Sequence, residues 1–137
     1  MKLIGYTFSR PFGGFIMPVP AQNSCLREYA SKQEALYQLP QLEHKFENCF
    51  MQLFTTIKLL KKNEEIVIYS VLMMPTNNDK IKKIFIEIKK RKSKIHFVLE
   101  NKIVKNIEEY NKLIFPYKIK KLINKKENLI NKLNEKK

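Results

Sequence analysis

Polar side chains that could bind or act on a ligand stand at the ends of two apolar segments. Ser9 and Arg10 follow the first apolar segment of the chain, and Tyr69 and Ser70 lie near the end of a nearly all-apolar segment around its middle. A hydroxyl, a guanidinium and a phenol are groups that hold phosphates and sugar hydroxyls. Glu43 adds a carboxylate, which could act as a general acid or base.

These residue types do not form a complete catalytic set in the sequence. Ser9 has no base close to it along the chain, and the two glycines at 13–14 match neither a GxGxxG fingerprint nor a P-loop. We therefore take Ser9, Arg10, Glu43 and Tyr69 as the candidate catalytic residues, and whether the protein is an enzyme stays open.

The cysteines and histidines do not indicate a metal site. Cys25 and Cys49 lie 24 residues apart without a CxxC motif, which favours two buried thiols over a zinc site or a disulfide framework. His44 and His96 are far apart in the sequence, and a lone histidine is more often structural or surface-exposed than catalytic. No metal and no cofactor is predicted.

Strands that alternate with helices must position the candidate residues. The patterns predict strands over 2–8, 35–39, 65–72 and 94–100, and helices over 21–33, 42–61 and 78–92. This alternation implies an α/β fold with parallel strands and right-handed crossovers, and we take the strand order to be 2-1-3-4. Residues 1–104 are expected to form this domain, and 105–137 a long, basic helical extension interrupted at Pro116.

Ligands of open parallel sheets bind at the carboxyl ends of the strands where the strand order reverses. That point lies between the first and third strands, and the first two helices begin at the same edge, with Gln22, Asn23 and Glu43 near their N-termini. The Gly- and Pro-rich loop at 9–20 is unusually apolar, as a lid or pocket wall would be.

The combination of groups at this edge suits a phosphorylated or sugar-like ligand. Arg10 or Arg27 would hold a phosphate, and the amides of Gln22 and Asn23 would bind hydroxyls. The alternative is that the same groups only cap helices and satisfy the backbone of loops.

The overall composition is that of one globular domain. The chain has 137 residues, of which 44% are hydrophobic, and no stretch reaches the roughly 18 uncharged apolar residues of a membrane span. The segment MKLIGYTFSR has too short an apolar run for a secretory signal. These features predict a cytoplasmic protein.

The positive charge is concentrated in the second half of the chain. The net charge is +2 over residues 1–75 and +12 over residues 76–137, which favours a polyanion partner such as nucleic acid, an anionic membrane surface or an acidic glycan. Lysine outnumbers arginine 24 to 3, although arginine recognises phosphate more specifically, and AT-rich codons would produce the same bias. Nucleic-acid binding is therefore possible but not favoured.

The C-terminal extension has an apolar side. Its apolar residues between 119 and 133 fall on one helical face, opposite lysines and interrupted by Lys126. Such a helix could form a homodimer, dock on another protein, pack on the open face of the sheet or lie on an anionic membrane.

Four segments resemble the sporadic carbohydrate cluster protein family, whose small bacterial members are encoded among surface-polysaccharide genes. They are GYTFSRPF (5–12), QNSCLREY (22–29), LEHKFENC (42–49) and IVIYSVLMMP (66–75). The resemblance implies a role in surface-carbohydrate biosynthesis with a nucleotide-sugar or sugar-phosphate ligand, and it leaves a sugar-modifying activity open. Its motif residues here are Tyr6, Ser9, Arg10, Pro11, Gln22, Asn23, Arg27, Tyr29, Glu43, Glu47, Asn48, Tyr69, Ser70 and Pro75, so Tyr6 and Asn48 join Gln22, Asn23, Arg27 and Ser70 as ligand-binding candidates.

The chain is similar, more distantly, to the catalytic domain of serine recombinases (resolvases and invertases). GY at 5–6, QN at 22–23 and the strand that ends in YSVLMMP carry this likeness, which implies the strand order 2-1-3-4 followed by a long dimerisation helix. The family places an arginine where Phe8 stands and its nucleophilic serine where Arg10 stands. The resemblance thus implies a resolvase-like fold without DNA cleavage, and leaves open a nucleic-acid-binding protein on a catalytically dead scaffold or a non-enzymatic adaptor.

Overall fold

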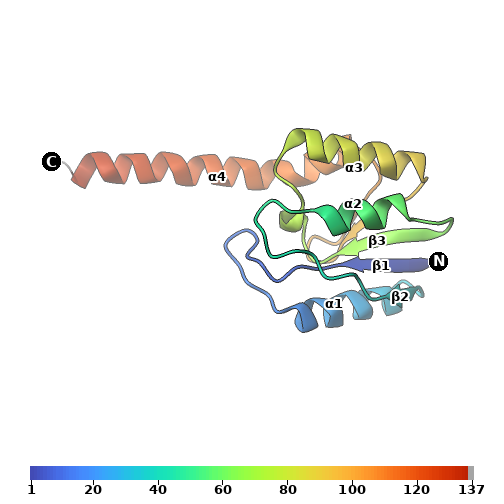
Figure 1. Ribbon diagram of the computed structural model, residues 1–137. Helices are drawn as coiled ribbons and strands as arrows, with labels where there is room; N and C mark the ends of the chain where they lie inside the picture. The colour runs from blue at the N-terminus through green and yellow to red at the C-terminus, as the bar shows by residue number, and fades with distance from the viewer. Residues whose placement is uncertain (136–137) are drawn as a thin grey trace.

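The computed structural model describes residues 1–135, in which helices cover both faces of a sheet and one long helix extends away from it (Figure 1). The strands are β1 (Lys2–Tyr6), β2 (Leu36–Gln38), β3 (Glu64–Ile68), β4 (Ile95–Phe97) and β5 (Lys102–Val104). The α-helices are α1 (Val19–Lys32), α2 (Met51–Lys58), α3 (Asn78–Lys90) and α4 (Ile107–Glu135), and a short 3-10 turn spans Val71–Met73. The α/β class predicted from the sequence is confirmed.

The sheet has five strands in the order β2-β1-β3-β4-β5. The first four are parallel, and Tyr6 of β1 pairs with Ile68 of β3. β5 runs antiparallel to β4, so the prediction of a purely parallel, four-stranded sheet is wrong. The chain turns back after β4 through Asn101, whose φ of 53° suits a tight turn. A three-residue strand such as β5 is too short to leave an alternating pattern in the sequence.

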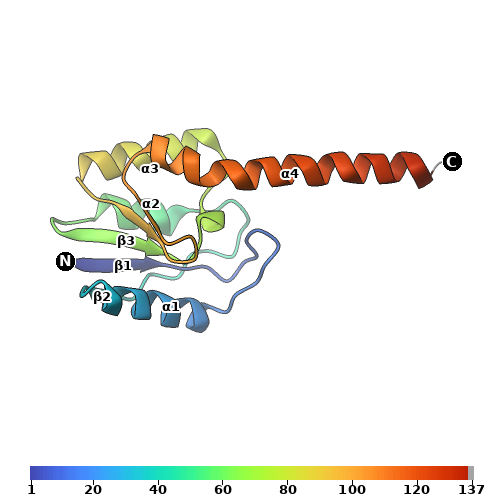
Figure 2. The same cartoon turned by 180° about the vertical axis from the view of Figure 1, so that it is seen from behind.

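The helices divide between the two faces of the sheet, which Figures 1 and 2 show from opposite sides. On the α1 face, Leu26 packs with Val67 of β3. On the face covered by α2 and α3, Ile84 packs with Ile68. Successive side chains of a strand point to opposite faces, so β3 is buried on both sides, and this is why its sequence is nearly all apolar.

The second helix is much shorter than the 42–61 predicted, because contacts with Arg10 draw the preceding segment into a loop. Arg10 Nη1 donates to the carbonyl oxygens of His44 and Phe46, at 3.0 and 3.1 Å. These carbonyl oxygens are therefore not used in the hydrogen bonds of a helix. Asn48 then adopts a φ of 58°, in the left-handed region. Phe46, expected on the core face of a helix, is 75% exposed.

The C-terminal helix runs without interruption through Pro116, so the predicted break there is wrong. Pro116 is exposed, and the carbonyl that it leaves without a helical partner can be solvated by water. Tyr110 and Ile114 anchor the first turns of α4 in the core, whereas residues 118–134 are all exposed. Within residues 1–135, no helix is both long and apolar enough to cross a bilayer.

Candidate functional site

The ends of β1 and β3 lie side by side, because the two strands pair in parallel up to Tyr6 and Ile68. The segments that follow them therefore leave the same edge of the sheet. The Phe12 ring, from the loop after β1, packs edge-on against the Tyr69 ring at a centroid distance of 6.2 Å. The structure thus brings the Ser9–Arg10 segment and the Tyr69–Ser70 segment together, and we call this edge the rim.

The Arg10 guanidinium is held at the rim by aromatic rings and by backbone carbonyl oxygens. Its guanidinium carbon lies 4.2 Å from the centre of the Phe8 ring and 4.8 Å from the centre of the Phe50 ring. Nη1 is held by the carbonyl oxygens of His44 and Phe46. Nη2 is also buried, and among the described residues it has no hydrogen-bond partner. Buried polar atoms nearly always have a hydrogen-bond partner, so an anion or a water molecule is expected to accept from this nitrogen.

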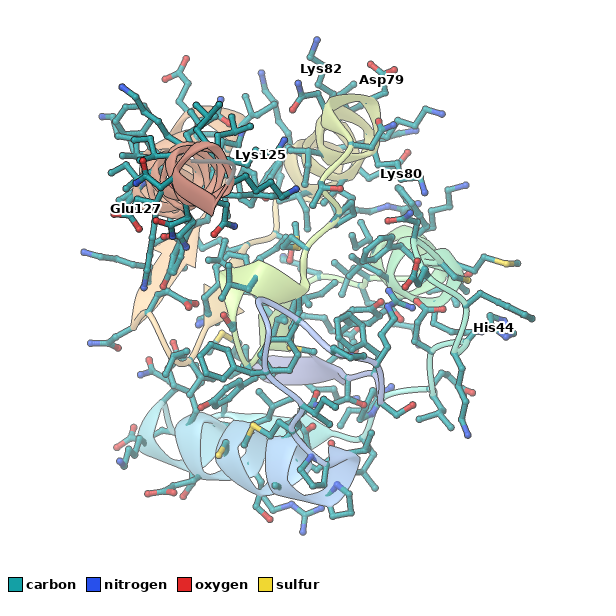
Figure 3. The ribbon with its side chains drawn as sticks, turned by 90° about the vertical axis from the view of Figure 1, so that its left-hand side faces the viewer. His44, Asp79, Lys80, Lys82, Lys125 and Glu127 are labelled. Carbon is teal, nitrogen blue, oxygen red and sulfur yellow. The ribbon has the colours of Figure 1, made fainter. Side chains whose placement is uncertain are left out.

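Lys80 places a second cation beside the same aromatic ring. Its Nζ lies 5.6 Å from the centre of the Phe50 ring and donates to the carbonyl oxygen of Asn48 at 2.9 Å. In Figure 3, Lys80 extends from α3 toward the side of the molecule where α2 and His44 lie. Sequence reasoning missed Lys80, although its place in the first turn of the helix after β3 put it at the correct edge of the sheet.

The carboxylate of Glu43 is buried and accepts hydrogen bonds on both oxygens. Oε2 accepts from the Tyr6 hydroxyl at 2.8 Å and from the backbone N–H groups of Gln52 and Leu53, at 3.1 and 3.3 Å. Oε1 accepts from the N–H of His44 at 3.0 Å. Glu43 therefore caps the N-terminus of α2 from a distance, which α2 needs because Phe50 at its start has no side-chain acceptor.

Tyr6 stays protonated as the hydrogen-bond donor of this pair. Burial raises the pKa of the Tyr6 phenol well above its ordinary value, and the neighbouring Glu43 carboxylate raises it further, while the positive charge of Arg10 acts in the opposite direction. The Tyr6 hydroxyl therefore donates to the Glu43 carboxylate, and this bond fixes the loop at residue 43 against the end of β1.

Two other predicted residues, Gln22 and Ser70, are tied into the fold, whereas Ser9 is exposed. The Gln22 amide donates to the carbonyl oxygens of Phe8 and Met17, both at 2.8 Å, and so closes the loop between β1 and α1. The buried Ser70 hydroxyl donates to Glu100 at 2.9 Å. Ser9 is exposed, and no hydrogen bond joins it to a base within residues 1–135.

Asn23 and Arg27 belong to a separate cluster on the α1 face. The Tyr37 hydroxyl donates to Asn23 Oδ1 at 2.8 Å, and the Arg27 guanidinium lies 5.9 Å from the centre of the Tyr37 ring. Burial raises the pKa of Tyr37 to about 12, with Arg27 opposing the shift. A Cβ at Gly5 would lie 2.3 Å from the Tyr37 hydroxyl oxygen, so the Tyr37 ring packs directly over the backbone of β1.

The loop between β1 and α1 folds over the rim as a small hairpin. Phe12 and Phe15 pair through two backbone hydrogen bonds of 2.8 and 2.9 Å, with Gly13 and Gly14 at positive φ between them. Phe12 is buried against Phe8, whereas Phe15 is 65% exposed. The loop therefore presents one aromatic ring to the core and one to solvent, beside the rim.

A buried histidine lies away from the rim, between α1 and the sheet. His96 Nδ1 lies 2.7 Å from the Tyr29 hydroxyl, and Nε2 lies 2.6 Å from Glu65 Oε1. Burial raises the pKa of Tyr29, and the Glu65 charge adds to this effect. The trio is a structural hydrogen-bond network that joins α1, β3 and β4, as the interpretation of His96 as structural anticipated.

One of the two cysteines lies at the rim, where Cys49 Sγ donates to Glu43 Oε1 at 3.7 Å. Cys25 and Cys49 are free thiols, as predicted, but both are partly exposed rather than buried. In the part of the chain that the structure describes, no three histidine, cysteine or acidic side chains gather where they could hold a metal ion.

In comparisons with known proteins, no family model matches this chain, and no curated protein matches it.

Proposed function

We propose that the protein binds a nucleotide-sugar or sugar-phosphate ligand at the rim, as part of bacterial surface-carbohydrate biosynthesis. The observation that carries this proposal is the buried Nη2 of Arg10, which lacks an acceptor. A phosphate oxygen is the acceptor that best matches a guanidinium, since the bond is charge-assisted on both sides. The resemblance of the rim segments to the sporadic carbohydrate cluster proteins supports the carbohydrate part of the proposal.

Each side chain of the rim has a role in this proposal. Arg10, held rigid between two aromatic rings, and Lys80 supply the positive charge for the phosphate. The exposed Ser9 hydroxyl and the ring of Phe15 contact the sugar. Tyr6 and Glu43 position the loop that carries the carbonyl partners of Arg10. Because Nη2 is buried, binding at this atom requires a small movement of the groups that surround it.

The same contacts favour binding over catalysis. Both oxygens of Glu43 already accept hydrogen bonds, so a role as general base would require breaking a helix cap. A sugar-modifying activity would depend on Tyr69, which is only partly buried, together with groups of the ligand itself.

The second candidate is a nucleic-acid-binding protein on a resolvase-like scaffold. The order β2-β1-β3-β4 and the long helix that follows the sheet support this alternative. The logarithm of its affinity for nucleic acid should fall linearly with the logarithm of the salt concentration. For each tenfold rise in salt, the fall should be about 0.7–0.9 log units per phosphate contact. A homodimer or an adaptor that acts through α4 belongs to the same alternative.

Isothermal titration with uridine diphosphate glucose, glucose 1-phosphate and free glucose tests the proposed ligand class. The wild-type chain should bind at least one phosphorylated compound and should not bind glucose. Lys80→Gln should weaken that binding roughly tenfold, because one cation beside the phosphate is lost. Arg10→Lys should weaken it by at least as much, since an ammonium cannot reproduce the guanidinium contacts.

Arg27→Gln is the matched control, because it removes one positive charge from the α1 face and leaves the rim intact. It should bind the phosphorylated compound as the wild type does. The proposal fails if none of the compounds binds, or if Arg27→Gln weakens binding as much as Lys80→Gln.

A further inference from the structure

The exposed part of α4 carries an apolar stripe made of two groups of residues, with Lys126 between them. Ile119, Leu122, Ile123, Leu129, Ile130 and Leu133 are each 40–66% exposed. Within each group the spacings are three and four residues, and Leu122 and Ile123 stand seven residues before Leu129 and Ile130, so all six lie on one side of the helix. Most of the stability of a helix in a protein comes from the packing of its apolar face, so the stripe is expected to have something that covers it.

This stripe points away from the protein's own core. The buried side of α4 is defined by Tyr110, Ile114 and the partly buried Tyr117. At 100° per residue, the centre of the stripe is rotated by roughly 150° from that side. In the geometry of a continuous helix, the stripe therefore cannot pack on the sheet that anchors the same helix.

Lysines border the stripe on the edge that faces α3. Lys118, Lys125 and Lys132 recur every seven residues along that edge. Figure 3 shows Lys125 on the side of α4 toward α3, and Glu127 on the other side. The outer surface of α3 also places an exposed apolar side chain between lysines. Ile86 is exposed and lies one helical turn from both Lys82 and Lys89.

The space between the two helices is a basic hollow. A cavity of about 710 Å³ between α3, the segment that follows it and the start of α4 is lined by five lysines and one acidic side chain. The lysines are Lys82, Lys89, Lys92, Lys94 and Lys105, and the acid is Glu108. A second hollow of about 380 Å³ continues along α4 to Phe115 and Lys118. The apolar stripe and the basic hollow therefore adjoin on one side of the molecule.

Charge and apolarity together restrict what can cover this side. A second copy of the chain would cover the stripe but would bring two strongly basic surfaces together, at a net charge of +14 per chain. A nucleic acid would pair with the lysines but would leave the branched aliphatic side chains in water, since single-strand binding relies on stacking with aromatic rings. An anionic lipid surface accommodates both kinds of side chain.

We propose that α4 and the outer face of α3 form a surface that binds anionic membranes, with the apolar stripe of 119–133 inserted at the boundary between headgroups and acyl chains. The helix lies in the plane of the interface, and the stripe extends for roughly 20 Å along it. The lysines of the hollow and of the flanking edge contact lipid phosphates. This surface is separate from the rim, and the inference does not depend on the proposed ligand of Arg10.

Co-sedimentation of the full chain with lipid vesicles tests this surface. Vesicles of phosphatidylcholine mixed with phosphatidylglycerol should bind the protein, and vesicles of pure phosphatidylcholine should bind it at least tenfold more weakly. The triple variant Ile119→Ser, Ile123→Ser, Ile130→Ser should reduce binding to the mixed vesicles at least tenfold. Replacing Lys118, Lys125 and Lys132 by glutamine should reduce it about fivefold for each lysine.

The control variant Asn124→Ser, Asn131→Ser changes the opposite side of the same exposed helix and should bind as the wild type does. All these positions are exposed, so circular dichroism should show that each variant keeps the fold of the body. The proposal is overturned if the mixed vesicles do not bind the wild type, or if the triple serine variant binds them unchanged. It is also overturned if light scattering shows a dimer that is lost in that variant while vesicles bind neither protein.

Discussion

Replacing Glu43 by glutamine tests whether this carboxylate is a structural cap. The side chain is 2% exposed, and its oxygens accept hydrogen bonds from the Tyr6 hydroxyl and from the backbone N–H groups of His44, Gln52 and Leu53. In the glutamine variant, one acceptor oxygen becomes an NH₂ group, so at least one buried donor loses its partner.

The expected cost is worked out from two effects. A buried donor left without its acceptor costs about 1–3 kcal/mol. Loss of the negative charge at the N-terminus of α2 costs roughly 0.5–1 kcal/mol more. We therefore expect Glu43→Gln to lower the free energy of unfolding by about 2–4 kcal/mol.

Urea unfolding followed by circular dichroism measures this change, with the slope compared between variants. Glu47→Gln is the matched control, because the Glu47 carboxylate lies in the same loop but is exposed, and it should change stability by less than about 0.5 kcal/mol. If Glu43→Gln were as stable as that control, the interpretation of Glu43 as a cap would be wrong, and its role as a free acid or base would have to be reconsidered.

Three further predictions concern other buried groups. Replacing His96 by leucine leaves the Tyr29 hydroxyl and the Glu65 carboxylate without their partner, so urea unfolding should show a loss of about 2–4 kcal/mol, and an unchanged midpoint would contradict the network. Glu100→Gln should cost about 1–3 kcal/mol in the same assay, because Glu100 accepts from a buried serine hydroxyl and a backbone N–H. Burial raises the pKa of Tyr110 to about 12 from 10.0, so the folded state holds this proton more tightly and stability should fall as the pH rises above 10. When the pH is raised from 8 to 11, the free energy of unfolding should fall by about 1.4 kcal/mol more in the wild type than in Tyr110→Phe. Equal falls in the two proteins would show that the pKa of this phenol does not change on folding.

The sequence predicted which segments lie side by side at one edge of the sheet, but not the contacts that their residues make. Residues that follow parallel strands leave the same edge, and this rule was enough to place the segment after β1 beside the segment after β3, where Phe12 contacts Tyr69. The acceptors of Arg10 lie 34 and 36 residues away along the chain, and no local pattern indicates such contacts. Lys80 was missed for the same reason, because its neighbours Asn48 and Phe50 come from a different loop.

The alternation of strands and helices could be read from the sequence because burial on one or two faces imposes a period that each segment carries within itself. The tertiary structure was needed wherever a distant group competes with that local preference. The segment at 42–50 has a helical pattern, yet it forms a loop because the Arg10 guanidinium occupies carbonyl oxygens that a helix would use. Likewise, β5 exists because β4 offers an open edge, and α4 passes Pro116 because solvent satisfies the carbonyl that the proline leaves free.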